Sequence, residues 1–122
     1  MSERQRQDLK ARTKAYALRV VRLYVALPKR TEAQVLGKQL LRSGTSVGAH
    51  YREACRAKSD ADFINKLEGA LQELEETGYW LELLADAEIV TLQRLTPLLS
   101  ETNELTAMFV TMVRNTKNRP SS

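Results

Sequence analysis

Apolar residues recur along the chain at spacings of three, four and seven, which is the period of an amphipathic helix rather than of a strand. In the first segment, the steps that lead from Leu9 to Leu27 are 7, 4, 3 and 4 residues long. Three further segments repeat this periodicity, and strand-like alternation is absent. The pattern predicts helices over residues of about 8–27, 31–57, 60–87 and 91–116.

Proline and hydroxyl residues mark the ends of these segments. Pro28 ends the first helix, because proline disfavours helical backbone in the residue before it. Thr31 and Ser59 are predicted to cap the second and third helices. Pro97 interrupts the fourth, which either kinks there or restarts with Thr96 as its cap and Pro97 as its first residue. We favour the restart, and therefore predict a break near Pro97.

The arrangement of these helices follows from their connections. Four helices of similar length need one another to cover their apolar stripes, and short links favour antiparallel neighbours. We therefore predict an all-α protein in which residues 1–122 form a single domain, an antiparallel up-down-up-down four-helix bundle.

The stretch LLRSGTSVGAHYREA, residues 40–54, contains glycine and serine residues that are poor helix formers. A phosphate-binding loop requires Gly-x-x-x-x-Gly-Lys-Ser/Thr between a strand and a helix. Here Gly44 and Gly48 are four residues apart, no Lys-Ser/Thr follows, and helical periodicity continues on both sides. We therefore expect continuous helix through residues 43–48.

Small residues would form a stripe along this predicted second helix. The spacings of 7, 4 and 7 residues connect Gly37, Gly44, Gly48 and Cys55. Each interior glycine costs roughly 1 kcal/mol relative to alanine, so the stripe calls for a packing reason. Either another backbone approaches it closely, or it accommodates the bulky Trp80 or Tyr79 within the bundle. Predicted packing or interface residues are Gly37, Gly44, Gly48, Tyr51, Tyr79 and Trp80.

Composition narrows the class of protein. Hydrophobic residues make up 43% and charged residues 28% of the chain, as in globular proteins. The single cysteine excludes an intrachain disulfide. The start of the chain is charged throughout, and the longest uncharged apolar run is too short to cross a bilayer. We expect a cytoplasmic protein with no membrane association.

Charge is distributed unevenly along the chain. Residues 1–58 hold fourteen Lys/Arg against four Asp/Glu, a balance of +10, whereas residues 59–122 hold five against eleven, a balance of −6. This asymmetry indicates either a polyanion-binding face or complementary faces that meet within the molecule or between copies.

The basic residues fall into two helical rows, one on each of the first two helices. Cationic rows of this kind suit a nucleic-acid backbone, because each neutralised phosphate releases a counterion. No groove-reading motif accompanies them, so sequence-specific recognition is not expected. The predicted nucleic-acid-binding residues are Arg12, Arg19, Arg22, Lys38, Arg42, Arg52 and Arg56.

The acidic residues of the third helix do not predict a metal site. A di-iron bundle requires Glu-x-x-His on two helices, and the chain has one histidine, His50. We instead expect Glu73 and Glu76 to form ion pairs or hydrogen bonds with arginines of the second helix. His50 and Cys55 are about 140° apart around a helix and so cannot form a nucleophile–base pair. No catalytic residue, metal or cofactor is predicted.

Residues 36–84 carry a resemblance to a known family. The motif Leu-Arg-Ser/Arg-x-x-Ser-Val/Ile-x-x-Asn/His-Tyr/Ile-x-Glu-Ala is followed by a phenylalanine-led helix and then by Glu-x-x-Glu-Thr-x-Tyr-Trp-Leu. The chain resembles the bacterial four-helix-bundle family of rRNA intervening-sequence proteins over residues 8 to 117. The matching positions are Arg42, Ser43, Ser46, Val47, His50, Tyr51, Glu53, Ala54, Phe63, Glu73, Glu76, Thr77, Tyr79, Trp80 and Leu81.

The resemblance implies a left-handed bundle assembled as a ring-like homopentamer, with some link to RNA. A related branch, the accessory variability proteins of diversity-generating retroelements, is similar in fold and binds nucleic acid and a reverse transcriptase. The resemblance implies no catalytic residue.

Two functional hypotheses follow. In the first, the chain is a non-enzymatic, homo-oligomeric RNA- or DNA-binding accessory factor that uses basic faces of its first two helices, with a reverse transcriptase or an RNA-processing protein as a further partner. In the second, it is a protein-interaction scaffold whose basic faces meet the acidic third helix of a neighbouring subunit.

Overall fold

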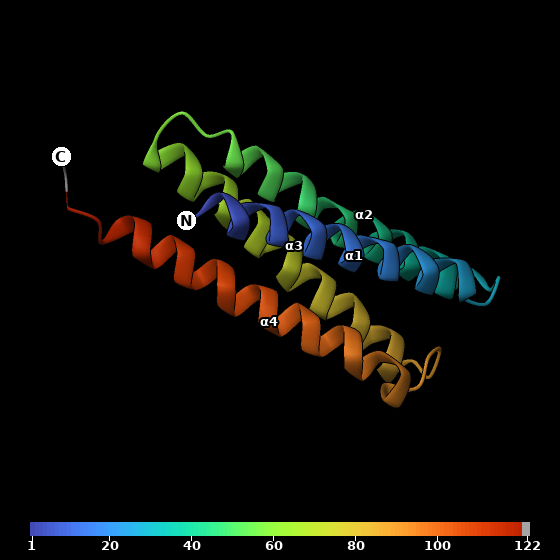
Figure 1. Cartoon of the computed structure of the whole chain (residues 1–122). Helices are drawn as coiled ribbons and strands as arrows, with labels where there is room; N and C mark the ends of the chain where they lie inside the picture. Colours follow the sequence, from blue (N-terminus) through green and yellow to red (C-terminus); the bar gives the residue numbers. More distant parts are fainter. Residues whose placement is uncertain (121–122) are drawn as a thin grey trace.

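Four helices account for nearly all of the chain in the computed structural model, which describes residues 1–120 (Figure 1). They are α1 (Glu3–Ala26), α2 (Thr31–Cys55), α3 (Asp60–Asp86) and α4 (Leu92–Lys117), and no strand occurs in the described range. Successive helices run in opposite directions and are joined by short loops. The all-α class with four helices is confirmed, and the helices follow the predicted up-down-up-down order.

The start of α1 lies several residues before the predicted one. Gln5 donates its backbone N–H to the Ser2 hydroxyl at 3.1 Å, and Ser2 donates its backbone N–H to the Gln5 side chain at 2.8 Å. This capping box satisfies two of the free N–H groups at the helix start. The first turns are polar and mostly exposed, so they carry no apolar stripe by which periodicity could detect them.

The predicted caps of α2 and α3 had different outcomes. Ser59 caps α3 as predicted, since its hydroxyl accepts a hydrogen bond from the Asp62 N–H at 3.1 Å. The prediction for Thr31 is wrong: Thr31 is already helical, and Arg30 occupies the N-cap position without a side-chain cap.

The predicted restart of the fourth helix at Pro97 is also wrong. Thr91 is the N-cap of α4, accepting a hydrogen bond from the Arg94 N–H, and the helix continues through Pro97 without a break. Pro97 lies in the second turn and has no backbone N–H, so the helical hydrogen bond to the Gln93 carbonyl is missing. Both Pro97 and Gln93 are exposed. The loss of one solvent-exposed hydrogen bond near a helix end leaves the remaining turns intact.

Each helix packs against its neighbours in the chain, most extensively α2 against α3, whereas α1 and α4 contact each other only slightly. The core contains side chains from all four helices. Within this core the fully buried rings of Tyr51 and Phe109 stack with their centroids 5.6 Å apart and their planes within 4°. Tyr51 is thus a core residue of the chain itself.

Buried hydroxyl groups also connect the helices. Tyr16 of α1 lies 2.6 Å from the Thr102 hydroxyl of α4, and Thr102 in turn donates to the Leu98 carbonyl. Across the core, Thr77 of α3 donates to the Ser43 hydroxyl of α2 at 2.8 Å. Burial raises the pKa of Tyr16 to about 12. These polar pairs satisfy one another inside an otherwise apolar interior.

Residues 43–48 are continuous helix within α2, as predicted, and their glycines face α1. A Cβ atom added at Gly44 would lie 2.7 and 2.8 Å from the two methyl groups of Val20. One added at Gly48 would lie 3.2 Å from the Thr13 hydroxyl and 3.7 Å from the backbone of α1. The close approach is therefore made by α1 of the same chain.

The alternative for the glycine stripe, accommodation of Trp80 or Tyr79, is wrong. Tyr24 of α1 and Leu27, its C-cap residue, occupy the space beside Gly37, so the three glycines of the stripe all lie on the α1 side of α2.

We predict opposite effects for two glycine-to-alanine substitutions. Gly44→Ala is expected to lower the free energy of unfolding by about 1–3 kcal/mol, because the β-branched Val20 has no flexible end that could move aside. Gly78→Ala is the matched control: nothing lies within 4 Å of its added Cβ, so the gain in helix propensity should raise the free energy by about 0.5–1 kcal/mol. Urea denaturation of both variants measures the contrast. Equal effects would show that α1 does not press against α2 at this point.

Candidate nucleic-acid interface

The outer face of α2 carries a row of four cations, Lys38, Arg42, Arg52 and Arg56, all of them exposed. The row exists because these positions follow helical spacing while the glycine stripe takes the side facing α1. Gly44 and Arg42 are two residues apart and therefore point about 160° away from each other around the helix axis. The packing against α1 thus directs Arg42 away from α1.

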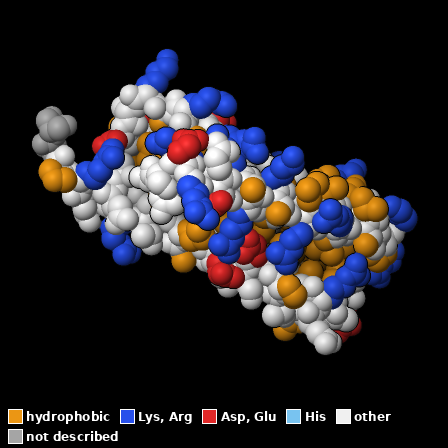
Figure 2. All heavy atoms as spheres, in the orientation of Figure 1, with side chains coloured by type: hydrophobic (Ala, Val, Ile, Leu, Met, Phe, Trp, Pro, Cys, Tyr) orange, Lys and Arg blue, Asp and Glu red, His pale blue; other side chains and the backbone are white. Residues whose placement is uncertain are grey.

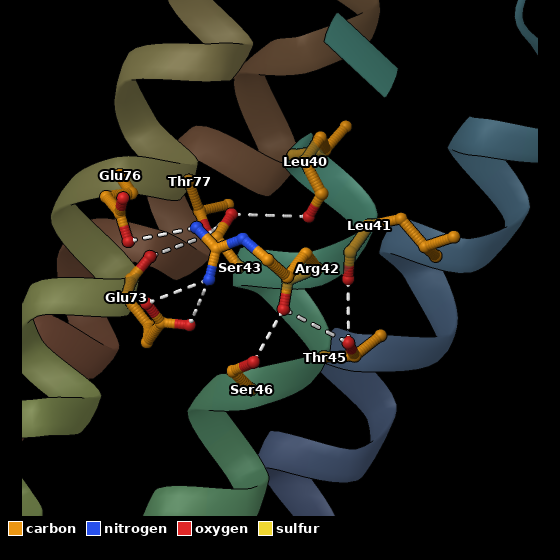
Figure 3. A network of polar contacts seen from close by, with 9 residues as sticks. All are labelled: Leu40, Leu41, Arg42, Ser43, Thr45, Ser46, Glu73, Glu76 and Thr77. Atoms are coloured by element: carbon orange, nitrogen blue, oxygen red, sulfur yellow. Dashed lines mark hydrogen bonds and ion pairs between the residues drawn. The ribbon is translucent and has the colours of Figure 1, made fainter. Parts of the chain in front are cut away.

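Arg42 forms ion pairs within the chain. Its Nη1 lies 3.1 Å from Glu73 Oε2, and its Nη2 lies 3.2 Å from Glu76 Oε2 (Figure 3). The hydrogen bond to Glu76, followed by the charge of Glu73, raises the pKa of Arg42 above its ordinary value. The predicted interaction of Glu73 and Glu76 with arginines of the second helix is confirmed. Arg42 therefore joins α2 to α3.

The serine and threonine residues around Arg42 donate hydrogen bonds to backbone carbonyls of α2. Ser46 donates to the Arg42 carbonyl at 2.7 Å and Thr45 to the Leu41 carbonyl at 2.7 Å (Figure 3). Ser43 likewise donates to the Leu40 carbonyl at 3.3 Å. Their hydroxyls bond back to the preceding turn, as is common for serine and threonine inside helices.

The other three cations of the α2 row have no carboxylate partner. Between residues 1 and 120, no Asp or Glu oxygen lies within 4.0 Å of the charged groups of Lys38, Arg52 or Arg56. Glu53, the acid beside Arg52 in the sequence, instead pairs with Lys66 of α3 at 3.1 Å. We call Lys38, Arg52 and Arg56 the free α2 row.

The row on α1 lies on a different flank. Arg12 binds Glu101 of α4 with two hydrogen bonds of 2.8 and 2.7 Å, and it lies 3.3 Å from Glu104. Arg19 and Arg22 line a cleft against α4 further along the same seam. Because Arg12 reaches across to α4 whereas Arg42 reaches across to α3, the two rows do not form parallel tracks on one face.

The bond to Arg12 changes the titration of its partner. Hydrogen bonding to the Arg12 guanidinium, opposed by burial and assisted by its charge, lowers the pKa of Glu101. The Glu101 side chain is only 14% exposed, so its charge depends mainly on Arg12. The Arg12–Glu101 pair is thus a structural link between α1 and α4.

The predicted aromatic residues lie in three different environments. Tyr51 is buried in the core. Trp80 is half-buried and packs against the edge of the same core. Tyr79 is 53% exposed, with its ring edge-on to Trp80 at a centroid distance of 5.1 Å. The outer face of α3 therefore presents an aromatic ring among carboxylates.

His50 and Cys55, both on α2, lie in different surroundings. His50 packs against Gly69 of α3, and its buried Nδ1 has no hydrogen-bond partner in the described part of the chain. Cys55 is half-buried. Within residues 1–120, no three His, Cys, Asp or Glu side chains are arranged to hold a metal ion.

A groove that sequence reasoning did not predict opens at the other end of the α1–α4 seam. It measures about 1060 Å³ and lies between the start of α1, the α2–α3 loop and the second half of α4. Leu9, Phe63 and Met108 line it together with Arg6, whose buried Nε has no partner among the described residues. Because the groove results from the limited contact between two distant helices, no local sequence pattern marks it.

These observations define an all-α, four-helix protein with a free cationic row on one helix. No helix in the described range is both long and apolar enough to cross a membrane. The chain belongs to the 23S rRNA-intervening sequence protein family, whose family model matches residues 6–111.

One solved structure supports this assignment. It is a protein of unknown function from the S23 ribosomal protein family of Bacteroides thetaiotaomicron, 40% identical in sequence with a TM-score of 0.83. The match covers 89% of this chain and 97% of that chain. A comparison with curated proteins found no match.

We predict that Arg12→Met lowers the free energy of unfolding by about 1–2 kcal/mol at pH 7, because Glu101 loses its charged partner. Arg12 lowers the pKa of Glu101 in the folded state below its ordinary value of 4.5. The stabilisation is therefore fully present above pH 4.5 and is lost as the pH falls through the lowered folded-state pKa. The difference between wild type and variant should therefore shrink in acid. Thermal denaturation from pH 7 to pH 3 measures it. Lys14→Met, at an exposed α1 position, is the control and should change stability by less than about 0.5 kcal/mol.

Proposed function

We propose that this protein is a non-enzymatic, homo-oligomeric accessory factor that binds RNA or DNA through the free α2 row. The observation that carries the proposal is the exposure of Lys38, Arg52 and Arg56 without carboxylate partners among residues 1–120, while neighbouring Arg42 is neutralised by α3. The name of the family refers to an intervening sequence of 23S rRNA, and this favours RNA as the polyanion.

The chemistry of the row suits a phosphate backbone. Arginine forks bind phosphate oxygens with two hydrogen bonds, and each neutralised phosphate releases a counterion. Arg52 lies in the last turn of α2, and Arg56 is the C-cap residue four positions further on. A row of this kind contacts phosphates without reading bases, so binding should depend strongly on salt and weakly on sequence.

Assembly would multiply this surface. The family resemblance implies a homopentamer, in which five copies of the row would act on one nucleic acid. Linked sites bind with a higher effective concentration than a single site, so weak contacts in each subunit would add up to tight binding. A reverse transcriptase or an RNA-processing protein is the further partner that the resemblance implies.

We expect Arg52→Glu combined with Arg56→Glu to weaken binding of a fluorescently labelled structured RNA at low ionic strength. The slope of log K against log salt should become shallower by about 0.7–0.9 for each phosphate that the variant no longer neutralises. Fluorescence anisotropy over a salt series measures both quantities.

The matched control for this experiment is Lys29→Glu combined with Arg114→Glu. It makes the same change in net charge at two exposed positions outside α2 and should retain most of the affinity. Equal losses in both double variants would show that only net charge matters, and the α2 interface would then be wrong.

A second candidate function is a protein-interaction scaffold, and the outer face of α3 favours it. Glu75, Tyr79, Glu82 and Asp86 follow helical spacing and are all exposed, so an acidic row with an aromatic centre faces outward. Charge complementarity would seat this row on the α2 row of a second copy. Because one surface would then bind a different surface, such contacts would form a ring if the rotation between subunits closes and an open filament if it does not.

The scaffold hypothesis predicts that Glu75→Lys combined with Glu82→Lys reduces the oligomer mass measured by light scattering. Like charges would then face each other across the contact. Glu32→Lys combined with Glu88→Lys makes the same charge change at exposed positions elsewhere and should leave the mass unchanged. An unchanged mass in the α3 variant would remove α3 from the contact.

A further inference from the structure

A small cleft lies between α1 and α4 near the end where α1 finishes and α4 begins. It measures about 200 Å³ and is lined by Arg19 and Arg22 of α1, Arg94 of α4, and three leucines. The leucines are almost fully buried, at 1–8% exposure, so they form an apolar floor beneath the guanidinium groups; they are Leu23, Leu95 and Leu98. We call this feature the three-arginine cleft.

The charges around this cleft are not balanced by the chain. No carboxylate of residues 1–120 lies within 4.0 Å of the Arg19, Arg22 or Arg94 guanidinium groups. Glu101 is close enough for Arg19 to lower its pKa, but Arg12 already occupies both of its oxygens. The first turn of α4 contains no acid and holds Arg94 instead.

The surface view agrees with this description. In the orientation where α1 and α4 lie in front, red acidic side chains gather near the middle of the molecule, and blue basic side chains surround orange apolar ones over the end where α1 finishes (Figures 1 and 2). Like charges collected over an apolar floor repel one another more strongly than they would in open water, because the local dielectric is lower. An anion from outside the chain would relieve this repulsion.

We propose that the three-arginine cleft binds a phosphate group with two negative charges, either inorganic phosphate or the terminal monoester of a nucleic acid. Three guanidinium forks offer more donors than the two oxygens of one carboxylate can accept, whereas phosphate presents three or more oxygens. The volume of about 200 Å³ lies below the range of about 300–1,000 Å³ typical of sites for larger ligands. The cleft therefore suits a small anion.

This site is separate from the proposed RNA interface. The free α2 row lies on α2, whereas the cleft is built from α1 and α4. Substitutions in one leave the other intact, so failure of one proposal is distinguishable from failure of the other.

The direct test is isothermal titration of the whole protein with inorganic phosphate at about pH 8, with chloride keeping the ionic strength constant. Wild type should bind phosphate, and Arg19→Gln and Arg94→Gln should each weaken binding by about tenfold or more, since each removes charge-assisted hydrogen bonds. Lys14→Gln on α1 and Arg114→Gln on α4 remove exposed charges away from the cleft and should bind like wild type. Circular dichroism confirms that each variant is folded.

A second arm distinguishes the sources of the phosphate. Short RNAs with a 5′ phosphate or a 5′ hydroxyl are compared in wild type, in Arg94→Gln, and in the Arg52→Glu and Arg56→Glu double variant. A preference for the phosphorylated end that Arg94→Gln abolishes and the α2 variant retains assigns the cleft to a nucleic-acid terminus. Phosphate binding without such a preference assigns it to free phosphate, and both results support the site.

Three results would overturn the site. The first is phosphate binding no stronger than that of chloride. The second is phosphate binding that survives unchanged in Arg94→Gln. The third is a change in oligomer mass in Arg94→Gln without any phosphate binding, which would show that an acidic segment of a second copy fills the cleft instead.

Discussion

The close approach of α1 and α2 is the constraint on which the rest of the surface depends. Val20 of α1 fits against Gly44, where an added Cβ would lie under 3 Å from both of its methyl groups, and Thr13 fits tightly against Gly48, where one would lie 3.2 Å from its hydroxyl. This fixes the rotation of both helices about their own axes. Arg12 and Arg19 each precede one of these α1 contacts by one residue, so they point about 100° away from α2, towards α4. The placement of charge is thus a consequence of apolar packing.

Ion pairs within the molecule neutralise part of the uneven charge of the sequence. Arg42 of the basic half meets Glu73 and Glu76 of the acidic half, and Arg12 meets Glu101. The two hypotheses raised by the charge asymmetry, complementary faces and a polyanion-binding face, therefore apply to different residues of the same rows. Complementarity accounts for the arginines opposite a carboxylate on the neighbouring helix, and the cations left over determine which surfaces are free to bind.

The sequence allowed the four helices, their order and the helical state of residues 43–48 to be predicted, because apolar periodicity is a local property. It misplaced the start of α1, although Ser2 and Gln5 have the spacing of a capping box that would have marked it. The sequence also predicted a helix start at Pro97. That prediction failed because the residues around Pro97 do not show that the helix already begins one turn earlier, at the Thr91 cap. The ion pairs were harder to predict from the sequence. Whether Arg12 or Arg19 meets an acid depends on the register of α4 against α1, and Arg12 and Glu101 are 89 residues apart in the chain.

The seam between α1 and α4 shows what that register implies. These two helices make the slightest contact in the molecule, and Arg12 with Glu101 provides a charged bridge near its middle. Towards the end where α4 begins, Arg94 lines the same cleft as Arg19 and Arg22, where an acid on α4 would have continued the bridge. A phosphate seated there would complete the bridge from outside, and it would stabilise the folded chain in proportion to its occupancy, because only the packed helices bring the three guanidinium groups together. The stability of the α1–α4 contact would then report the presence of the ligand.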